Sequence, residues 1–192
     1  MTDRNFKPDS GTDLVFEDAG STDRLRITDG GSTILYEDDG NAALMIDTEG
    51  CVTKAAQPCF CVPGLSGAMS LTNSWVDITT WDTERVDRGS RFASGIFTAP
   101  VAGVYLFNFQ CSLSSLTDLD RVICGIASTN LTSYALASQS VDDPTIGQVN
   151  ITQIIDMAAT HTSKVIVTNI TASRGQVDSG DEWTQFNGYL LV

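Results

Sequence analysis

The sequence predicts an all-β protein whose C-terminal part is an antiparallel jelly-roll sandwich, preceded by a short β-repeat region. Three observations lead to this fold class. Thr, Ser, Gly and Val are plentiful and Lys is nearly absent, a composition that favours strands and turns over helices. Apolar and polar residues alternate through residues 104–113, which is the pattern of a half-buried strand. No segment carries an apolar stripe at the helical period with capping residues at its ends.

The first 57 residues divide into an arm and a repetitive region. Residues 1–13 are polar and predict an extended N-terminal arm. In residues 14–57, short apolar runs recur about every ten residues between Asp-Gly turns, which is typical of hairpins. Strands this short cannot bury a core alone. The region is therefore either a meander packed on the following domain or, as we favour, a stem or anchor in which three chains cover one another's apolar faces.

Residues 58–192 predict one larger domain. Pro58 and Pro63 bracket a short strand, because proline is confined to the ends and edges of strands. Further strands are expected at residues 104–113, 121–127, 132–138, 148–157, 163–171 and 186–192. Turns rich in Asp, Ser and Gly separate these segments. About eight to ten short strands with short connections are typical of a sandwich or jelly roll.

Two motifs within this domain are rich in aromatic residues. Residues 97–109 read FTAPVAGVYLFNF, and residues 186–191 read FNGYLL. Together they resemble the central and closing motifs of the complement C1q globular-head family, whose domains share the tumour-necrosis-factor-like jelly roll. The resemblance implies a homotrimer and a set of core positions. These positions are Phe97, Gly103, Tyr105, Phe107, Phe109, Phe186, Gly188 and Leu190.

The motif residues suit a core physically. Each aromatic side chain would bury on the order of 150–250 Å², and Gly103 would open a tight turn where a Cβ atom would crowd the entering strand. The chain also departs from the family pattern. Ser90 stands where the family has an aromatic residue or Leu, and Phe92 is the nearest substitute. A collagen-like stalk and the disulfide and secretory features of the animal members are missing.

Charge and cysteine usage restrict the partners and the compartment. The formal net charge is −13, so the chain has no electrostatic reason to hold a phosphate backbone and we expect no nucleic-acid partner. The sequence starts without an apolar leader, and no run reaches membrane-spanning length, so we expect no membrane insertion. The five cysteines lack disulfide-framework spacing and are interpreted as reduced, buried thiols. We therefore expect folding in a cytoplasm.

The passage between the two regions carries a second resemblance. Residues 23–27 read DRLRI, and residues 46–60 read IDTEGCVTKAAQPCF. These segments resemble the stem-to-head passage of bacteriophage fibre and virion-surface proteins that carry a C1q-like head. The resemblance implies a virion protein assembled in the host cytoplasm, which agrees with the acidic composition and the reduced cysteines.

The sequence offers little catalytic chemistry. His161, the one histidine, stands near Ser163 without a placed acid or a nucleophile-elbow context, so we predict no enzyme and no cofactor. Asp118, Asp120, Asp142 and Asp143 are candidate calcium ligands, with solvated turn residues as the alternative interpretation. The three tryptophans could line a glycan-binding or partner surface, or lie in the core or an interface; they are Trp75, Trp81 and Trp183.

These inferences lead to one functional prediction and two alternatives. We predict a homotrimeric bacteriophage structural protein, a tail or head fibre or spike, whose C1q-like head binds a host-surface glycan or protein and whose N-terminal region binds other virion proteins. The first alternative is a capsid decoration protein anchored by the N-terminal region. The second is a secreted C1q-like pattern-binding module, which a signal peptide or a disulfide pattern would favour.

Overall fold

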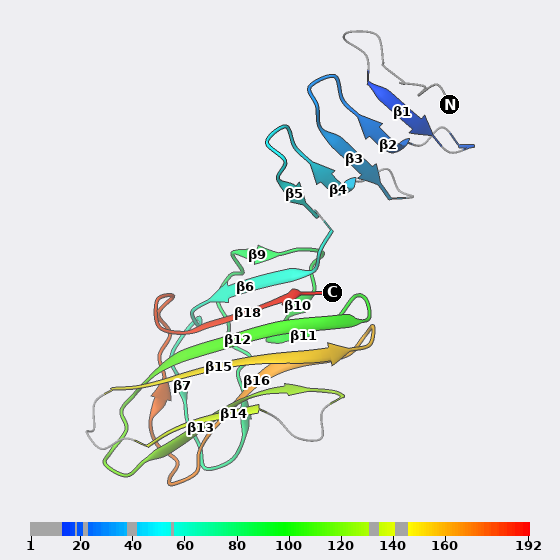
Figure 1. Cartoon of the computed structure of the whole chain (residues 1–192). Coiled ribbons are helices and arrows are strands. Elements are labelled where there is room, and N and C mark those ends of the chain that lie inside the picture. Colours follow the sequence, from blue (N-terminus) through cyan, green and yellow to red (C-terminus); the bar gives the residue numbers. More distant parts are fainter. Residues whose placement is uncertain are drawn as a thin grey trace. The chain divides into compact units, whose positions relative to one another are not determined.

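The chain divides into two compact units, Met1–Gln57 and Pro58–Val192. The structure, a computed structural model, describes residues 13–17, 19–20, 23–37, 42–54, 56–130, 135–140 and 146–192. Every regular element among these residues is a β-strand (Figure 1). Among them, no helix has the length and apolar character needed to cross a membrane.

The N-terminal unit is one antiparallel sheet with strand order β1-β2-β3-β4-β5. The strands are β1 (Leu14–Glu17), β2 (Asp23–Ile27), β3 (Thr33–Tyr36), β4 (Ala42–Ile46) and β5 (Val52–Thr53). Each strand pairs with the next along the chain, as the Asp-Gly spacing predicts. In two of these turns, Gly31 and Gly50 take positive φ angles of 90° and 84°, which glycine adopts at little cost.

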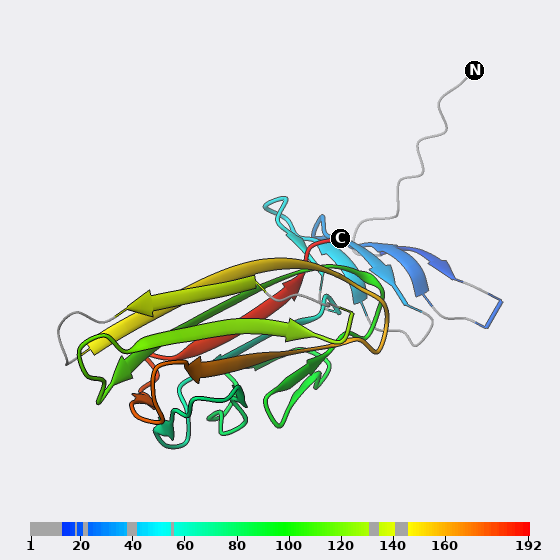
Figure 2. The same cartoon turned by 90° about the horizontal axis from the view of Figure 1, so that it is seen from below.

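The C-terminal unit is a sandwich of two antiparallel sheets (Figures 1 and 2). The first sheet contains β6 (Cys59–Pro63), β7 (Met69–Ser70), β9 (Val86–Asp87), β12 (Gly103–Ser114), β15 (Ile146–Met157), β17 (Gln176–Val177) and β18 (Gln185–Leu190). The second contains β8 (Val76–Asp77), β10 (Phe92–Ala93), β11 (Ile96–Thr98), β13 (Arg121–Ser128), β14 (Ala135–Ser140) and β16 (Thr162–Asn169). In the first sheet, β12 is central and pairs with β15 on one side and β18 on the other.

The core lies between the two sheets and is built around the aromatic residues of the two motifs. Tyr105, Phe107 and Phe109 alternate along β12 and are fully buried. Phe60 stacks on Phe92 with ring centroids 4.8 Å apart and on Phe97 at 5.0 Å. Stacked and edge-on aromatic pairs add stability beyond their buried area. Phe92, two residues after the family's expected position at Ser90, is therefore part of this core.

Two glycines of the motifs allow close packing in the first sheet. A Cβ atom on Gly188 would lie 2.5 Å from Phe60 Cε1 and 2.7 Å from Phe107 Cδ1. Gly103 begins β12 instead of opening a tight turn, so the role expected for it was wrong in detail. A Cβ atom there would meet the Val192 carbonyl oxygen at 2.5 Å, because the last residues of the chain pair with the start of β12.

The strands expected in the C-terminal unit occur near their expected positions. The segments 104–113, 121–127, 148–157 and 186–192 correspond to β12, β13, β15 and β18 with boundaries shifted by a few residues. Residues 132–134 of another expected strand lie outside the described residues. Several two-residue strands between residues 69 and 93 had no expected counterpart, because two-residue pairings leave no visible alternation.

Candidate functional site

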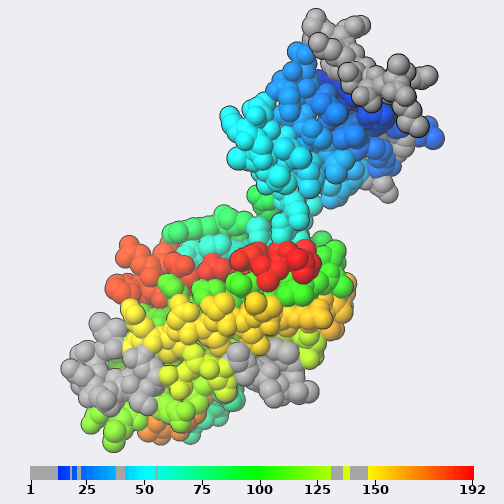
Figure 3. Space-filling model, in the orientation of Figure 1, coloured from blue at the N-terminus to red at the C-terminus, as the bar shows by residue number. Residues whose placement is uncertain are grey.

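One face of the first sheet turns away from the core. We call this face, formed by side chains of β6, β18, β12 and β15, the outer face. Figure 3 shows these strands running across the side of the C-terminal unit that faces the viewer. Its members follow from the strand registers. They include Cys59, Cys61, Val104, Leu106, Asn108, Gln110, Asn150, Thr152, Ile154, Asp156, Gln185, Asn187 and Tyr189.

The outer face has an apolar row and one exposed charged side chain, Asp156, which lies opposite Val104 beside that row. Leu106 lies opposite Tyr189 on one side and Ile154 on the other, and the exposed fractions of Tyr189 and Ile154 are 44% and 60%. Asn108, the next outward residue, donates a hydrogen bond to Thr152 Oγ1 at 2.9 Å. On a chain of net charge −13, a face with so few charged residues can be buried against a second molecule at a smaller desolvation cost than the rest of the surface.

The N-terminal sheet also has an unusually apolar face. Its registers place two rows of side chains on the same side of the sheet. This apolar face consists of Leu14, Phe16, Leu25, Ile27, Thr33, Leu35, Leu44, Ile46 and Val52. Phe16, Leu35 and Val52 are 51%, 42% and 58% exposed. A contiguous exposed apolar surface marks an interaction site, and a single-layer sheet needs a second layer to bury it.

The three tryptophans lie in different environments. Trp81 is half-buried and packs edge-on against Phe109, and its indole N–H donates to the Ile78 carbonyl at 2.9 Å. Trp75 and Trp183 are 47% and 50% exposed. Of the two candidate roles, Trp81 therefore takes the core role, while the other two indoles remain available to a ligand or a partner.

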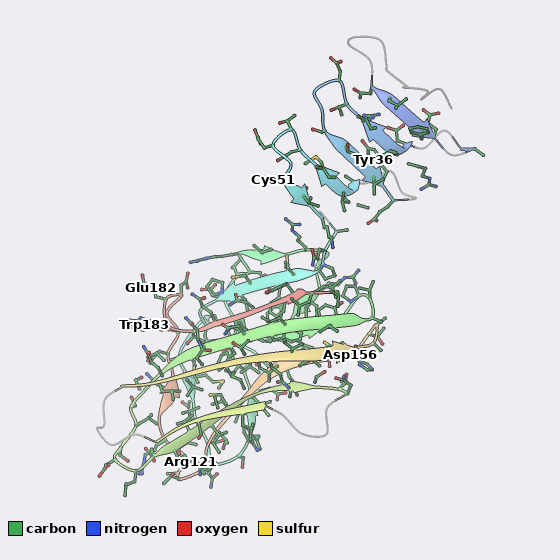
Figure 4. The ribbon with its side chains drawn as sticks, in the orientation of Figure 1. Tyr36, Cys51, Arg121, Asp156, Glu182 and Trp183 are labelled. Carbon is green, nitrogen blue, oxygen red and sulfur yellow. The ribbon has the colours of Figure 1, made fainter. Side chains whose placement is uncertain are left out.

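Trp183 lies in the loop between β17 and β18, at the end of the first sheet where β18 begins (Figure 4). It borders a hollow of about 340 Å³, which we call the Trp183 pocket. The pocket is lined by Ala68, Ser112, Gln176, Asp178, Ser179, Gly180 and Trp183. Asp178 is the only ionisable residue in this lining, and its carboxylate accepts a hydrogen bond from Ser112 Oγ at 2.9 Å.

The calcium candidates do not form a site in the described part of the chain. Asp120 is fully buried, and its carboxylate accepts from Arg174 Nε at 2.8 Å and from the Thr117 backbone N–H at 2.8 Å. Asp118 is exposed in the same turn. Asp142 and Asp143 lie outside the described residues. Within the ranges that the structure describes, no group of three or more His, Cys, Asp or Glu side chains is arranged to hold a metal ion.

His161 has a structural role in a turn. Its Nδ1 atom accepts a hydrogen bond from the Ala158 backbone N–H at 3.1 Å, and its carbonyl accepts from the Ala99 N–H at 2.9 Å. The hydroxyl of nearby Ser163 is buried and makes no hydrogen bond to His161. The pair therefore lacks the geometry of an activated nucleophile, which requires a base within hydrogen-bond reach.

The outer face and the Trp183 pocket contain residues that were not identified as functional from the sequence. Asn108, Gln110 and Ser112 were recognisable as the polar side of one strand, but their neighbours across the sheet lie about 40 positions away. Asp178 belongs to a carboxylate-rich stretch that the sequence offers only as a possible calcium ligand or a solvated turn, and Gln176 had no signal of its own.

The likeness of this chain to known proteins is structural. No protein-family model matches the sequence, and no curated protein matches it. The globular domain of zebrafish complement 1qA matches with a TM-score of 0.55 and 18% identity, over 70% of this chain and 98% of that domain. Eiger, a TNF from S. frugiperda, matches with 0.54 and 12%, over 71% and 94%. Murine APRIL matches with 0.54 and 11%, over 70% and 99%.

These likenesses define the class of fold and confirm the fold prediction. The chain is an all-β protein that contains a C1q/TNF-like jelly roll. At 11–18% identity the likeness shows the fold alone and leaves function to the surfaces described above.

Proposed function

We propose that this protein is a homotrimeric bacteriophage virion protein, a fibre or spike whose jelly-roll head binds a host surface or another partner. The apolar face of the N-terminal sheet carries the proposal. Eight of its nine side chains are aliphatic or aromatic, and five of them are more than one-third exposed in the single chain. A sheet with this face uncovered would aggregate or associate. Three copies around one axis would cover all three faces at once.

The outer face of the C-terminal unit supports the same assembly. Its apolar row consists of Tyr189, Leu106 and Ile154, and Asp156 beside this row is its one charged residue among those named above. Two copies of a surface with net negative charge would repel each other, so an interface is expected where charged residues are few. The two faces together would give each protomer an interface along both of its units.

The virion role is supported by the organisation of the chain and by the resemblance of residues 46–60 to fibre stem-to-head passages. Two compact units meet within this same passage, at Gln57 and Pro58. A repeat sheet followed by a jelly roll fits a stem or anchor that carries a head. In this proposal the N-terminal unit attaches to other virion proteins, and the role of the head is binding.

The assembly can be tested by measuring the mass of the full chain in solution. Sedimentation equilibrium should give three times the 20.6 kDa chain mass. Leu35→Asp, on the apolar face of the N-terminal sheet, should weaken the trimer, because it would bury an unpaired charge. Thr53→Asp is the matched control, since Thr53 is exposed on the opposite face of the same sheet. A stable monomer would rule out the proposed assembly.

The place on the particle can be tested by imaging. Particles carrying a tag after Val192 should be labelled at fibre or spike positions. Labelling over the whole capsid would instead favour the decoration protein, whose N-terminal unit grips the shell. Purified particles that lack the protein would refute both virion roles.

A further inference from the structure

The Trp183 pocket has the composition of a small-ligand site that the proposed function does not itself identify. We propose that it binds a single pyranose ring of a glycan, stacked on the Trp183 indole and hydrogen-bonded to the Asp178 carboxylate. The volume of about 340 Å³ falls at the small end of ligand pockets. Only the role of this site in host binding rests on the proposed function; the pocket itself is argued from its own geometry.

The Trp183 indole gives the pocket a flat apolar side whose position is fixed before a ligand binds. Its backbone N–H donates to the Gly180 carbonyl at 2.9 Å, which closes a tight turn. A Cβ atom on Gly180 would lie 2.5 Å from Trp183 Cδ1, so the glycine lets the indole lie against the backbone. Half of the Trp183 surface stays exposed. An indole held in this way can stack on the C–H face of a sugar at little entropic cost.

Buried Thr184 holds the loop that carries the indole. The Thr184 side chain is fully buried, and its Oγ1 donates to the Asp178 carbonyl at 2.6 Å. Its backbone N–H also donates to the Gly180 carbonyl, at 3.1 Å. These bonds tie the two ends of the loop together, so the indole and the Asp178 carboxylate keep a fixed spacing before any ligand binds.

Asp178 supplies directed acceptors beside this indole. Ser112 Oγ donates to its Oδ2 at 2.9 Å, and Ser114 Oγ donates to its Oδ1. A carboxylate oxygen has about two acceptor positions, so each oxygen retains one for a ligand hydroxyl. Gln176, which also lines the pocket, donates from Nε2 to Ser114 Oγ at 3.1 Å and joins the same polar network. Two neighbouring hydroxyls of a sugar match such a bidentate acceptor.

The lining selects against other small ligands. The lining has no basic side chain, and its carboxylate would repel phosphate, sulfate and carboxylate groups. Quaternary ammonium groups are usually held by a cage of several aromatic rings, and Trp183 is the one aromatic residue here. A neutral ring with one apolar face and a polar edge fits one indole and one carboxylate.

The pocket is separate from the apolar row of the outer face. Ser112 follows Leu106 by six residues in β12, so the pocket and the apolar row lie about 20 Å apart along the strand. The proposed protomer contact and the proposed sugar contact can therefore be altered independently.

Fluorine NMR of the full chain labelled with fluorotryptophan tests the proposal directly. The three tryptophans give three signals, assigned with the variants Trp183→Phe, Trp75→Phe and Trp81→Phe. Methyl hexopyranosides and methyl N-acetylhexosaminides are titrated to about 50 mM, well above the ~1 mM dissociation constant expected for one small ring. At least one pyranoside should shift the Trp183 signal saturably and leave the Trp75 signal in place.

Variants separate stacking from general surface effects. Asp178→Asn, which keeps the shape and loses the charged acceptor, should weaken binding by about tenfold. Trp183→Ala should abolish pyranoside binding, measured by ligand-observed NMR. Trp75→Ala, which removes an equally exposed indole from the other side of the sandwich, should retain it. Binding that persists in Trp183→Ala, or the absence of any pyranoside response, would overturn the proposal.

Two further outcomes are informative. A response of Trp183 to tetramethylammonium but to no pyranoside would replace the sugar by a cationic ligand and overturn the proposal. The mass of the same sample is measured in parallel. A monomer that binds pyranosides would refute the trimer and keep the pocket, whereas a trimer that binds none would refute the pocket and keep the trimer.

Discussion

Asp120 and Arg174 form an ion pair whose carboxylate is fully excluded from solvent, with Arg174 Nε 2.8 Å from Oδ2 and 3.1 Å from Oδ1. The pair connects the turn before β13 to the loop before β17. The Arg174 guanidinium, helped by the Thr117 backbone N–H, lowers the pKa of Asp120 from 3.8 to about 2 despite the opposing effect of burial. The folded state therefore stabilises the charged form of this carboxylate.

This pKa shift predicts a specific loss of stability in acid. Because the folded pKa lies below the unfolded one, the contribution of Asp120 is complete above about pH 4 and is lost as the pH falls toward 2. Asp120→Asn should lower the free energy of unfolding by roughly 2 kcal/mol at neutral pH and by much less near pH 2. Urea unfolding at both pH values measures the difference. Asp118→Asn, exposed in the same turn, should change little, and an equal loss at both pH values would contradict the assignment.

Any side chain at Gly188 should destabilise the folded protein. A methyl group there would lie within 3 Å of both Phe60 and Phe107 in the centre of the core. We expect Gly188→Ala to lower the free energy of unfolding by about 1–3 kcal/mol, the cost of overpacking. Gly67→Ala is the control, since nothing lies within 4 Å of its Cβ position. Equal denaturation midpoints for the two variants would show that the core adjusts freely at Gly188.

The outer face should respond to charge where the opposite sheet does not. Ile154→Asp places a carboxylate in the apolar row, and Leu136→Asp places one on β14 in the other sheet; the two side chains are 60% and 53% exposed. Only Ile154→Asp should dissociate the trimer, because only that carboxylate would be desolvated between copies. Light scattering after size exclusion gives the mass. Dissociation by Leu136→Asp alone would move the interface to the second sheet.

The five thiols should differ in reactivity. Cys111 and Cys124 face each other across the core with sulfurs 4.0 Å apart, and their hydrogen bond together with burial raises the pKa of Cys124. Neither should react with iodoacetamide in the folded protein, whereas exposed Cys51 should react quickly. The partly exposed Cys59 and Cys61 lie on the outer face and should become more reactive in the Ile154→Asp variant. Peptide mass spectrometry measures each site, and urea-unfolded protein supplies the fully reactive reference.

The sequence predicts the sandwich because its signals are local. Alternation over residues 104–113 and the aromatic spacing of residues 97–109 depend only on neighbours in the chain, and both correspond to buried faces in the structure. Gly103 shows where local reasoning ends. The sequence indicated that a side chain at this position would be crowded. The atoms that would clash, however, belong to Val192 and Leu190, which are about 90 residues away.

The candidate surfaces depend on strand register and could not be derived in the same way. Asn108 meets Thr152, and Ser112 shares a pocket with Trp183, only after β12, β15 and β18 have been aligned. A shift of one residue in any of these strands would turn the outward side chains into the core. The apolar face of the N-terminal sheet was closer to prediction, since short hairpins fix their own register.

The position of β18 has a consequence for biosynthesis. This strand, which comes later in the chain than both of its neighbours, lies between β12 and β6 inside the first sheet. The segments on either side of it are translated long before it, and until it arrives each presents an unpaired backbone edge. A chain interrupted before Gln185 would keep both edges open and lack Phe186 from its core. Strand order would thus delay assembly until β18 has been made, because a chain without β18 cannot present the outer face.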